Sequence, residues 1–229
     1  MDTIRENWER LQERLVVAAG RSGRDPGDIA VVAAAKTRSA VEIEAAVRSG
    51  ICMVGENRVQ ETEEKKARVD AAAQWHFLGH LQSNKAKKAV ALFDMVQSVD
   101  TRRIADALDQ RAGQAGRVLD ILVQVNTSGT TSQSGVPPEQ ALELAGQLAG
   151  LSNLRIRGLM TIGAFDPDET VVRASFARLR RLRDDFAAAR VDGVETRYLS
   201  MGMSGDFEWA VEEGANMVRL GTVLFGPRT

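Results

Sequence analysis

Cysteine, long apolar runs and an excess of one charge are all missing from this sequence. Cys52 is the only cysteine among 229 residues, so no internal disulfide can form and a cysteine-based zinc site is not expected. The 30 Lys and Arg residues balance 31 Asp and Glu, which argues against a protein built to bind nucleic acid. Apolar runs such as 29–35 are too short to cross a bilayer, and the charged N-terminal segment has no signal-peptide core. We therefore expect a reduced, cytoplasmic protein without membrane or nucleic-acid partners.

Aromatic residues are also scarce, at 5% of the chain, and Tyr198 is the only tyrosine. The composition is otherwise that of an ordinary globular chain, with 44% hydrophobic and 27% charged residues. We take Cys52 to be a small core residue. The length suits one large domain, and we expect residues 1–229 to form it.

The apolar pattern alternates regularly between two kinds of segment. Short runs rich in apolar and β-branched residues predict strands, and segments with apolar residues at helical spacing predict helices. The predicted strands are 29–35, 51–57, 75–80, 93–100, 118–127, 156–162, 194–202 and 216–226. The predicted helices are 4–20, 41–50, 59–72, 83–92, 101–114, 137–150, 168–190 and 206–215.

Eight strands separated by helices indicate an α/β protein with a parallel sheet. We predict a (β/α)8 TIM barrel preceded by one extra N-terminal helix; the alternative is a doubly wound open sheet. The polar, glycine-containing loops at 126–136 and 201–205 follow strands. In a barrel these loops lie on the face formed by the carboxyl ends of the strands, where active sites are built.

Lys36 is the most unusual residue, because seven apolar residues precede it at the end of the first predicted strand. We expect it to point into the barrel mouth with little water around it. Such surroundings disfavour the ammonium form and leave an amine that can attack a carbonyl. The alternative is a lysine that extends to solvent from a strand end.

A phosphate site is indicated by LSMGMSGD at 199–206 and VRLGTVLFG at 218–226. Each is a strand that runs into small residues, and the loops after strands seven and eight are the common phosphate site of barrels. Asp206 would cap the following helix. The alternative is that these glycines serve tight turns. The candidate phosphate-binding residues are Ser200, Ser204, Gly221 and Thr222.

Arg219 lies two residues before Gly221, so both face the same side of the last strand. An arginine inside a barrel needs a partner, either a ligand atom or a buried acid. Asn57 and Arg58, after the second strand, are further polar groups for the mouth. An amine after the first strand, with a phosphate site after the last two, points to pyridoxal 5′-phosphate (PLP).

His76 and His80 flank the third predicted strand, and their spacing would place both on one face. No third ligand accompanies them, so we predict no metal site and interpret both as core or rim residues.

At this point the sequence closely resembles the pyridoxal phosphate homeostasis family. The resemblance covers nearly the whole chain, in order. It rests on AAAKT around Lys36, VGENRVQE at 54–61, WHFLGHLQSNK at 75–85, LVQVNTS at 122–128, IRGLMTI at 156–162, LSMGMSGDFEWAVEEGANMVRLGT at 199–222 and FG at 225–226.

The resemblance implies a barrel like the N-terminal domain of alanine racemase, with bound PLP. Lys36 would form the internal aldimine, Asn57 would lie near the cofactor ring and Arg219 would face the pyridine nitrogen. The phosphate would be held by Ser200, Ser204, Gly221 and Thr222. Some bacterial relatives have a lysine where Gln133 stands here, which puts a second PLP-accepting position in doubt.

A cation beside the pyridine nitrogen makes the ring a weaker electron sink. Racemisation would also need an acid or base on each side of the substrate α-carbon. Lys36 supplies one, whereas Tyr198 lies within a strand, and no residues remain for the second domain that racemases of this type use. We therefore predict a PLP carrier without efficient turnover, monomeric, which delivers PLP to apo PLP-dependent enzymes. The alternatives are a PLP-dependent amino-acid racemase and a Schiff-base aldolase acting on a sugar phosphate.

Overall fold

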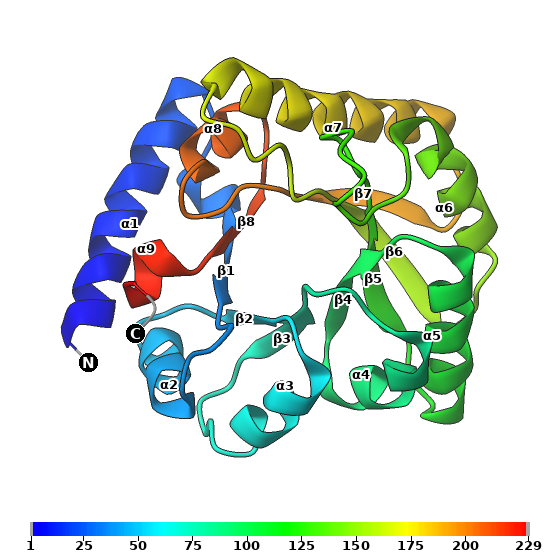
Figure 1. The fold of residues 1–229 in the computed structure, drawn as a ribbon, viewed down its shortest axis with the longest axis horizontal. Helices are drawn as coiled ribbons and strands as arrows, with labels where there is room; N and C mark the ends of the chain where they lie inside the picture. Colours follow the sequence, from blue (N-terminus) through cyan, green and yellow to red (C-terminus); the bar gives the residue numbers. More distant parts are fainter. Residues whose placement is uncertain (1, 228–229) are drawn as a thin grey trace.

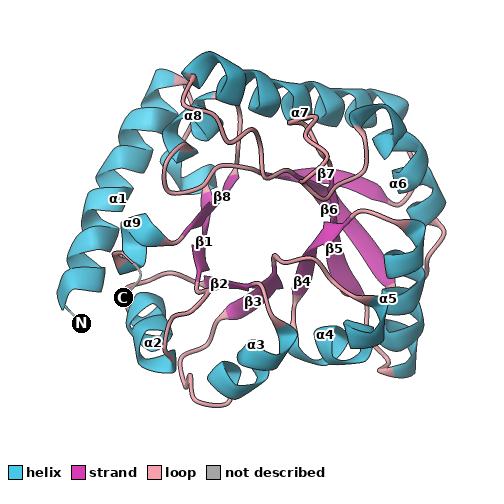
Figure 2. Ribbon diagram, in the orientation of Figure 1, coloured by secondary structure: helices cyan, strands magenta, loops and turns pink. Residues whose placement is uncertain are grey.

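Eight parallel strands close into a barrel at the centre of the molecule (Figures 1 and 2). The computed structural model describes residues 2–227. Each strand pairs with the next along the chain, and the last pairs with the first, with Val32 opposite Arg219. The closed ring confirms the predicted TIM barrel and excludes the open sheet. The strands are β1 Ala30–Ala34, β2 Met53–Glu56, β3 Gln74–Phe77, β4 Met95–Val99, β5 Leu119–Gln124, β6 Leu154–Met160, β7 Val194–Ser200 and β8 Met217–Leu220.

Helices surround the barrel, and the first of them precedes the first strand, as predicted (Figure 1). It packs against the last two helices, which brings the N-terminal segment beside the C-terminal one. No helix within residues 2–227 combines the length and the apolar character that a membrane crossing requires. The helices are α1 Asp2–Arg21, α2 Ala40–Arg48, α3 Val59–Lys66, α4 Ala86–Leu92, α5 Arg102–Gln114, α6 Ala141–Ala149, α7 Glu169–Ala189, α8 Phe207–Glu212 and α9 Thr222–Phe225.

Local sequence signals account for several helix starts. Ser39 and Glu42 form a capping box at the start of α2, in which each side chain accepts a hydrogen bond from the other residue's backbone N–H. Thr101 caps α5 by accepting from the N–H of Ile104. These caps lie where the chain leaves a strand and turns back along the outside of the barrel.

Two predicted boundaries are wrong. The helix predicted over 59–72 ends at Lys66, because Glu44 of α2 accepts hydrogen bonds from the backbone N–H groups of Asp70 and Ala71. This interaction holds the chain in an extended approach to β3. The segment predicted as one strand and turn over 216–226 divides instead into β8 and the short helix α9.

The core has two parts. The larger part lies between the strands and the ring of helices, and a smaller apolar group lies inside the barrel. The interior group consists of Val32, Met95, Leu122, Met160 and Met217. Polar side chains are also buried, among them His76, Gln97, Ser200 and Arg219. The barrel interior is therefore unusually polar for a TIM barrel, which branched aliphatic residues normally fill.

Candidate functional site

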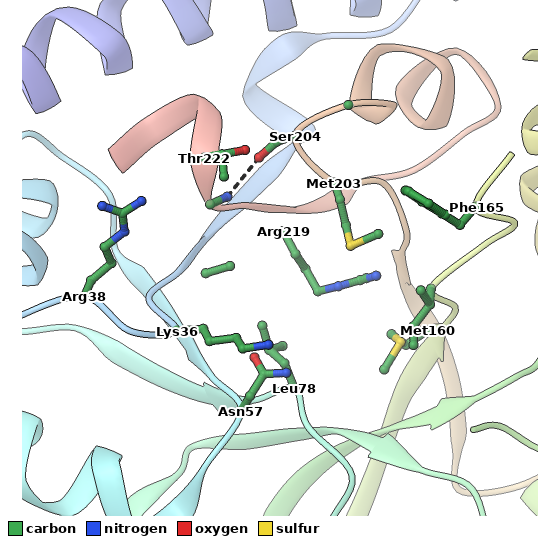
Figure 3. Close-up of a pocket in the computed structure, with 14 residues that line it drawn as sticks. Lys36, Arg38, Asn57, Leu78, Met160, Phe165, Met203, Ser204, Arg219 and Thr222 are labelled. Atoms are coloured by element: carbon green, nitrogen blue, oxygen red, sulfur yellow. Dashed lines mark hydrogen bonds between the residues drawn. The ribbon is translucent and has the colours of Figure 1, made fainter. Parts of the chain in front are cut away.

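A cavity of about 490 Å³ opens among the loops at the carboxyl ends of the strands (Figure 3). Its volume suits a small organic ligand. Of the predicted site residues it brings together Lys36, Asn57, Ser204, Arg219, Gly221 and Thr222, but neither Ser200 nor Arg58. The lining residues are Ala34, Lys36, Arg38, Asn57, Leu78, Met160, Ile162, Phe165, Met203, Ser204, Gly205, Arg219, Gly221 and Thr222.

Lys36 projects into this cavity from a tight turn (Figure 3). The N–H of Arg38 donates to the carbonyl of Ala35 at 2.9 Å, with Lys36 and Thr37 at the centre of the turn. Thr37 has a φ of 67°, a region that β-branched residues rarely adopt. Backbone strain of this kind is concentrated at functional sites. The hydrogen bond between Arg38 and Ala35 holds the chain in this bend, which presents Lys36 to the cavity.

The Lys36 side chain is exposed, so the expectation that little water surrounds its amine is wrong. Among residues 2–227, no hydrogen-bond or ion-pair partner is found for its ammonium nitrogen within the structure. The reason for the exposure is that the strand ends at Ala34 and the lysine stands above the barrel rather than inside it. An unengaged amine at a cavity wall is suited to react with a ligand that enters from solvent.

A buried ion pair supports the turn from below. Lys65 of α3 donates to the carbonyl of Ala35 at 3.1 Å and to the carboxylate of Glu56 at 2.6 Å. Glu56 has no exposed surface, and one of its oxygens has no hydrogen-bond partner. Burial raises the pKa of Glu56, and the ammonium group of Lys65 opposes that shift. This pair connects the outer helix to the ends of β1 and β2.

The predicted phosphate cradle lies where β8 gives way to α9. The hydroxyl oxygen of Ser204 accepts from the backbone N–H groups of Gly221 at 3.1 Å and Val223 at 3.3 Å. Thr222 begins α9 beside them and lines the cavity. The hydroxyl group of Ser204, with the two backbone N–H groups that it accepts from, thus lies beside Thr222 and Gly221 at the cavity wall. Such an arrangement suits an anion.

Asp206 precedes α8 as predicted, but its side chain does not cap that helix. Its carboxylate instead accepts from the N–H of Met203 at 2.6 Å, which closes the turn that presents Ser204. Burial raises the pKa of Asp206, whereas the N–H of Met203 and the positive charge of Arg219 oppose that shift. The acid therefore shapes the cavity loop from behind.

Ser200 does not line the cavity, so the prediction that it helps to hold a phosphate is corrected. Its side chain is 0% exposed inside the barrel. Its hydroxyl donates to the side-chain carbonyl of Gln97 at 2.7 Å and accepts from Arg219 at 2.8 Å. Because Ser200 ends β7 while Ser204 follows in the loop, only Ser204 reaches the cavity.

Arg219 occupies the cavity floor with 6% of its surface exposed (Figure 3). Its second Nη donates to the carbonyl of Thr161 at 2.8 Å. The sequence left open whether a buried acid is the partner of Arg219. No described Asp or Glu side chain forms an ion pair with Arg219. Burial lowers the pKa of Arg219 to about 10, against the opposing charge of Asp206. The side chain is therefore a cation at neutral pH, with N–H groups left to face a ligand.

Asn57 lines the cavity immediately after β2 (Figure 3). Its backbone lies so close to Gly79 that a Cβ on that glycine would be 2.3 Å from the carbonyl oxygen of Asn57. The glycine of the WHFLGH motif thus allows the loop after β3 to approach. Arg58 turns away to solvent and pairs with Glu61 at 2.8 Å, so it takes no part in the cavity.

Several lining residues carried no sequence signal. Arg38 is 8% exposed and donates to the carbonyl oxygens of Gly226 and Pro227, which ties the turn of Lys36 to the end of α9. Phe165, in the loop after β6, is 98% exposed at the cavity rim. Neither follows from local pattern, because the loops that carry them meet only in the closed barrel.

The two histidines are separated by the end of β3, so the prediction that they share a strand face is wrong. His76 is 2% exposed inside the barrel, and burial lowers its pKa to about 4. His80 lies exposed in the following loop. Within residues 2–227 no group of three or more His, Cys, Asp or Glu side chains is placed to hold a metal ion. Cys52, expected in the core, is exposed just before β2.

Tyr198 and Gln133, both discussed from the sequence, do not line the cavity. Tyr198 lines a separate hollow with Arg24 and Asn216, residues that precede β1 and β8, at the opposite end of the barrel. Gln133 donates from its side-chain amide to the carbonyl of Gly163 at 2.9 Å. It therefore joins the loop after β5 to the loop that carries Phe165.

Comparisons with known proteins agree with this architecture. The family model described as "Alanine racemase, N-terminal domain" matches residues 1–229. A pyridoxal phosphate homeostasis protein of Pseudomonas aeruginosa is 41% identical over 229 residues, which cover 100% of this chain and 97% of that protein. The structure of PipY from Synechococcus elongatus with PLP bound has a TM-score of 0.85 and 35% identity, and the match covers 97% of this chain and 100% of PipY. Alanine racemase from Clostridium difficile, with a TM-score of 0.82 and 16% identity, shares the fold, and the match covers 100% of this chain and 60% of the racemase.

Proposed function

The chain belongs to the alanine racemase N-terminal domain family, among its pyridoxal phosphate homeostasis proteins, and from this premise we propose that it binds PLP in the described cavity and serves PLP homeostasis. We further propose that residues 1–229 form one PLP-binding domain. The observation that carries the proposal is the convergence of an unengaged lysine, a buried arginine and a hydroxyl-rich backbone cradle on one cavity of suitable size.

The residues present fit each part of the cofactor. When bound, PLP supplies an aldehyde that condenses with a primary amine, and Lys36 is the amine that the cavity offers. The hydroxyl groups of Ser204 and Thr222 are suited to the phosphate, and the N–H groups of Gly221 and Val223, which donate to Ser204, hold that hydroxyl at the cavity wall. Arg219 would face the pyridine nitrogen, and Asn57 would lie beside the ring.

We propose that the protein carries PLP rather than using it. The described residues that line the cavity include no aspartate, glutamate, histidine or tyrosine. A racemase needs a second proton-transfer group opposite its lysine. Tyr198, the only tyrosine of the chain, lines a different hollow. Arg219, a fixed cation, also disfavours protonation of the ring and so weakens it as an electron sink. These features favour a carrier, and we propose that it delivers PLP to apo PLP-dependent enzymes and works as a monomer.

The attachment site is tested by reduction with borohydride. The PLP-loaded protein is expected to be yellow, and reduction is expected to add one PLP mass on Lys36. A Lys36→Ala variant should lose that adduct, whereas Lys87→Ala, at an exposed position on α4, should keep it. An equal adduct on the Lys36→Ala protein would show that the attachment site is elsewhere.

The carrier role is tested by transfer and by exchange. Loaded protein is mixed with an apo PLP-dependent enzyme, with and without a trap for free PLP. Activation of the enzyme in the presence of the trap is expected from direct delivery. Incubation with L-amino acids in deuterated water separates the racemase alternative, because rapid α-deuterium incorporation with formation of the D-isomer contradicts a carrier without turnover.

A further inference from the structure

A chain of buried hydrogen bonds crosses the barrel interior behind Arg219. Its Nη1 donates to the hydroxyl of Ser200 at 2.8 Å, and that hydroxyl donates to the side-chain carbonyl of Gln97 at 2.7 Å. The amide nitrogen of Gln97 lies 2.8 Å from Nδ1 of His76. These side chains come from β8, β7, β4 and β3 and are at most 6% exposed. Only the first of them reaches the cavity.

The orientation of the Gln97 amide gives this series of hydrogen bonds its direction. With the amide nitrogen directed at the sulfur of Met217 and at the imidazole, Nδ1 of His76 accepts and the ring proton lies on Nε2. The carbonyl of Gln97 then faces Ser200, which leaves the serine oxygen to accept from Arg219. If His76 were charged, its Nδ1 would carry a proton and would face the amide nitrogen of Gln97, so that two donors would oppose each other. Burial keeps this histidine neutral, since it lowers the pKa of His76 to about 4.

Packing alone does not explain why these residues are polar. Each buried polar group costs free energy unless it is paired, and TIM-barrel interiors are usually aliphatic. Every hydrogen-bonding group from Arg219 Nη1 to His76 Nδ1 is matched, and the amide of Gln97 also contacts the sulfur of Met217 at 3.2 Å. Fully satisfied networks of this kind restrict their members to one orientation.

We propose that Ser200, Gln97 and His76 are positioning residues that hold the guanidinium of Arg219 in the orientation that recognises the pyridine ring of the cofactor. This inference rests on the proposed PLP site and extends it to residues outside the cavity. It replaces the direct phosphate role that the sequence suggested for Ser200. This series of hydrogen bonds leaves the remaining N–H groups of Arg219 directed at the ligand. It also restrains the arginine side chain, which otherwise has many rotamers.

The test uses a ligand that cannot react with Lys36. The analogue 4′-deoxypyridoxine 5′-phosphate keeps the ring and the phosphate but lacks the aldehyde. Its binding is measured by calorimetry for the wild-type protein, Ser200→Ala and Ser98→Ala. Ser98 is the matched control, because it is 2% exposed on β4 and its hydroxyl has no partner. Ser200→Ala is expected to bind roughly tenfold more weakly, and Ser98→Ala as tightly as wild type.

The ultraviolet spectrum of the bound analogue reports the protonation of its pyridine ring. A general loss of protein stability would not change that protonation. We expect the wild-type protein to hold the ring unprotonated to lower pH than Ser200→Ala does, because a restrained cation disfavours a second positive charge nearby. Equal affinities and equal spectra for the two serine variants would overturn the proposal. A wild-type protein that binds neither PLP nor the analogue would instead overturn the proposed function.

Two measurements remain decisive if Ser200→Ala fails to fold. Gln97→Met preserves the size of the side chain and breaks the chain one step further from the cavity, so it should change affinity and spectrum in the same direction, by a smaller factor. In the wild-type protein, 15N NMR should find the ring proton of His76 on Nε2. A proton on Nδ1 would contradict the direction of the chain and with it the proposal.

Discussion

The ammonium group of Lys65 lies 2.6 Å from the carboxylate of Glu56, which has no exposed surface at all. The same group donates to the carbonyl of Ala35, directly before Lys36. A helix on the outside of the barrel is thus linked, through a pair of charges outside the cavity, to the turn that carries Lys36.

Lys65→Met is expected to lower the free energy of unfolding by about 3–5 kcal/mol, because it leaves a buried carboxylate without a counter-charge. The double variant Lys65→Met/Glu56→Gln should recover much of the loss. Lys88→Met is the control, since Lys88 and Glu63 form an exposed pair on neighbouring helices that contributes about 0–1 kcal/mol. Urea denaturation measures all three variants. The lone Glu56 carboxyl has a raised pKa, so the loss should grow with increasing pH. A loss no larger than that of the control would contradict a structural role for the pair.

The positive φ of Thr37 predicts an inverted preference between alanine and glycine. Thr37→Gly should be more stable than Thr37→Ala by about 1 kcal/mol, because only glycine adopts this backbone conformation without strain. The same two substitutions at Val41, an exposed position in α2, should give the opposite order. Thermal unfolding of the four variants provides the comparison. If alanine is the better residue at both positions, the turn is not strained.

The neutral state of His76 makes stability depend on pH. Its pKa is about 4 in the folded protein, against 6.5 for an unperturbed histidine, so the unfolded chain binds a proton first as the pH falls. The contribution of the neutral His76 to the free energy of unfolding is fully present above pH 6.5 and is lost as the pH decreases toward 4. Between pH 7 and pH 5 the loss amounts to about 2 kcal/mol.

The measurement is the unfolding free energy at both pH values for the wild-type protein, His76→Gln and His80→Gln. The loss between pH 7 and pH 5 should be about 2 kcal/mol smaller for His76→Gln, whereas the exposed His80 is expected to be replaceable without that effect. An unchanged pH dependence in His76→Gln would show that the buried histidine does not remain neutral.

Gly79, which packs against Asn57 of the cavity wall, can be compared with Gly146 as a control. A Cβ at Gly79 would lie 2.3 Å from the carbonyl oxygen of Asn57, whereas one at Gly146, within α6, would meet no atom within 4 Å. Gly79→Ala is expected to cost about 1–3 kcal/mol and to weaken PLP binding by displacing Asn57. Gly146→Ala should add about 0.5–1 kcal/mol of stability. Calorimetry with PLP and thermal unfolding distinguish them; two neutral substitutions would show that the loop after β3 yields without disturbing Asn57.

Much of the architecture is predictable from local pattern. Each strand was recognisable as a short apolar run and most helices by their spacing, because periodicity and capping act within a few residues. Lys36 and the small residues around Gly221 were predictable as neighbours at one face of the barrel for a related reason, since the loops after the strands meet at that face. The error at 59–72 arose where contacts from another helix overruled the local pattern, and Cys52 is exposed because it lies in the loop before β2.

The depth of a side chain inside the barrel was not predictable. The sequence predicted Ser200 as a phosphate-binding residue, but the register between strands decides whether an inner side chain meets the cavity or the layer beneath it. The partners of Arg219 come from Ser200 and from the carbonyl of Thr161, separated from it by 19 and 58 residues. Such hydrogen bonds exist only after closure of the sheet.

The sequence by itself determined a βα-alternating chain and the positions of Lys36 and of the small residues around Gly221 at the ends of strands, because these features depend on hydrophobic periodicity and on which loops follow which strands. Tertiary structure alone decided that Lys36 stands exposed on a strained turn, and that Ser200 is buried beneath the cavity in a hydrogen bond with Arg219. The physical reason is that closing the barrel sets the depth of each inward side chain and joins polar groups whose pairing no local pattern encodes.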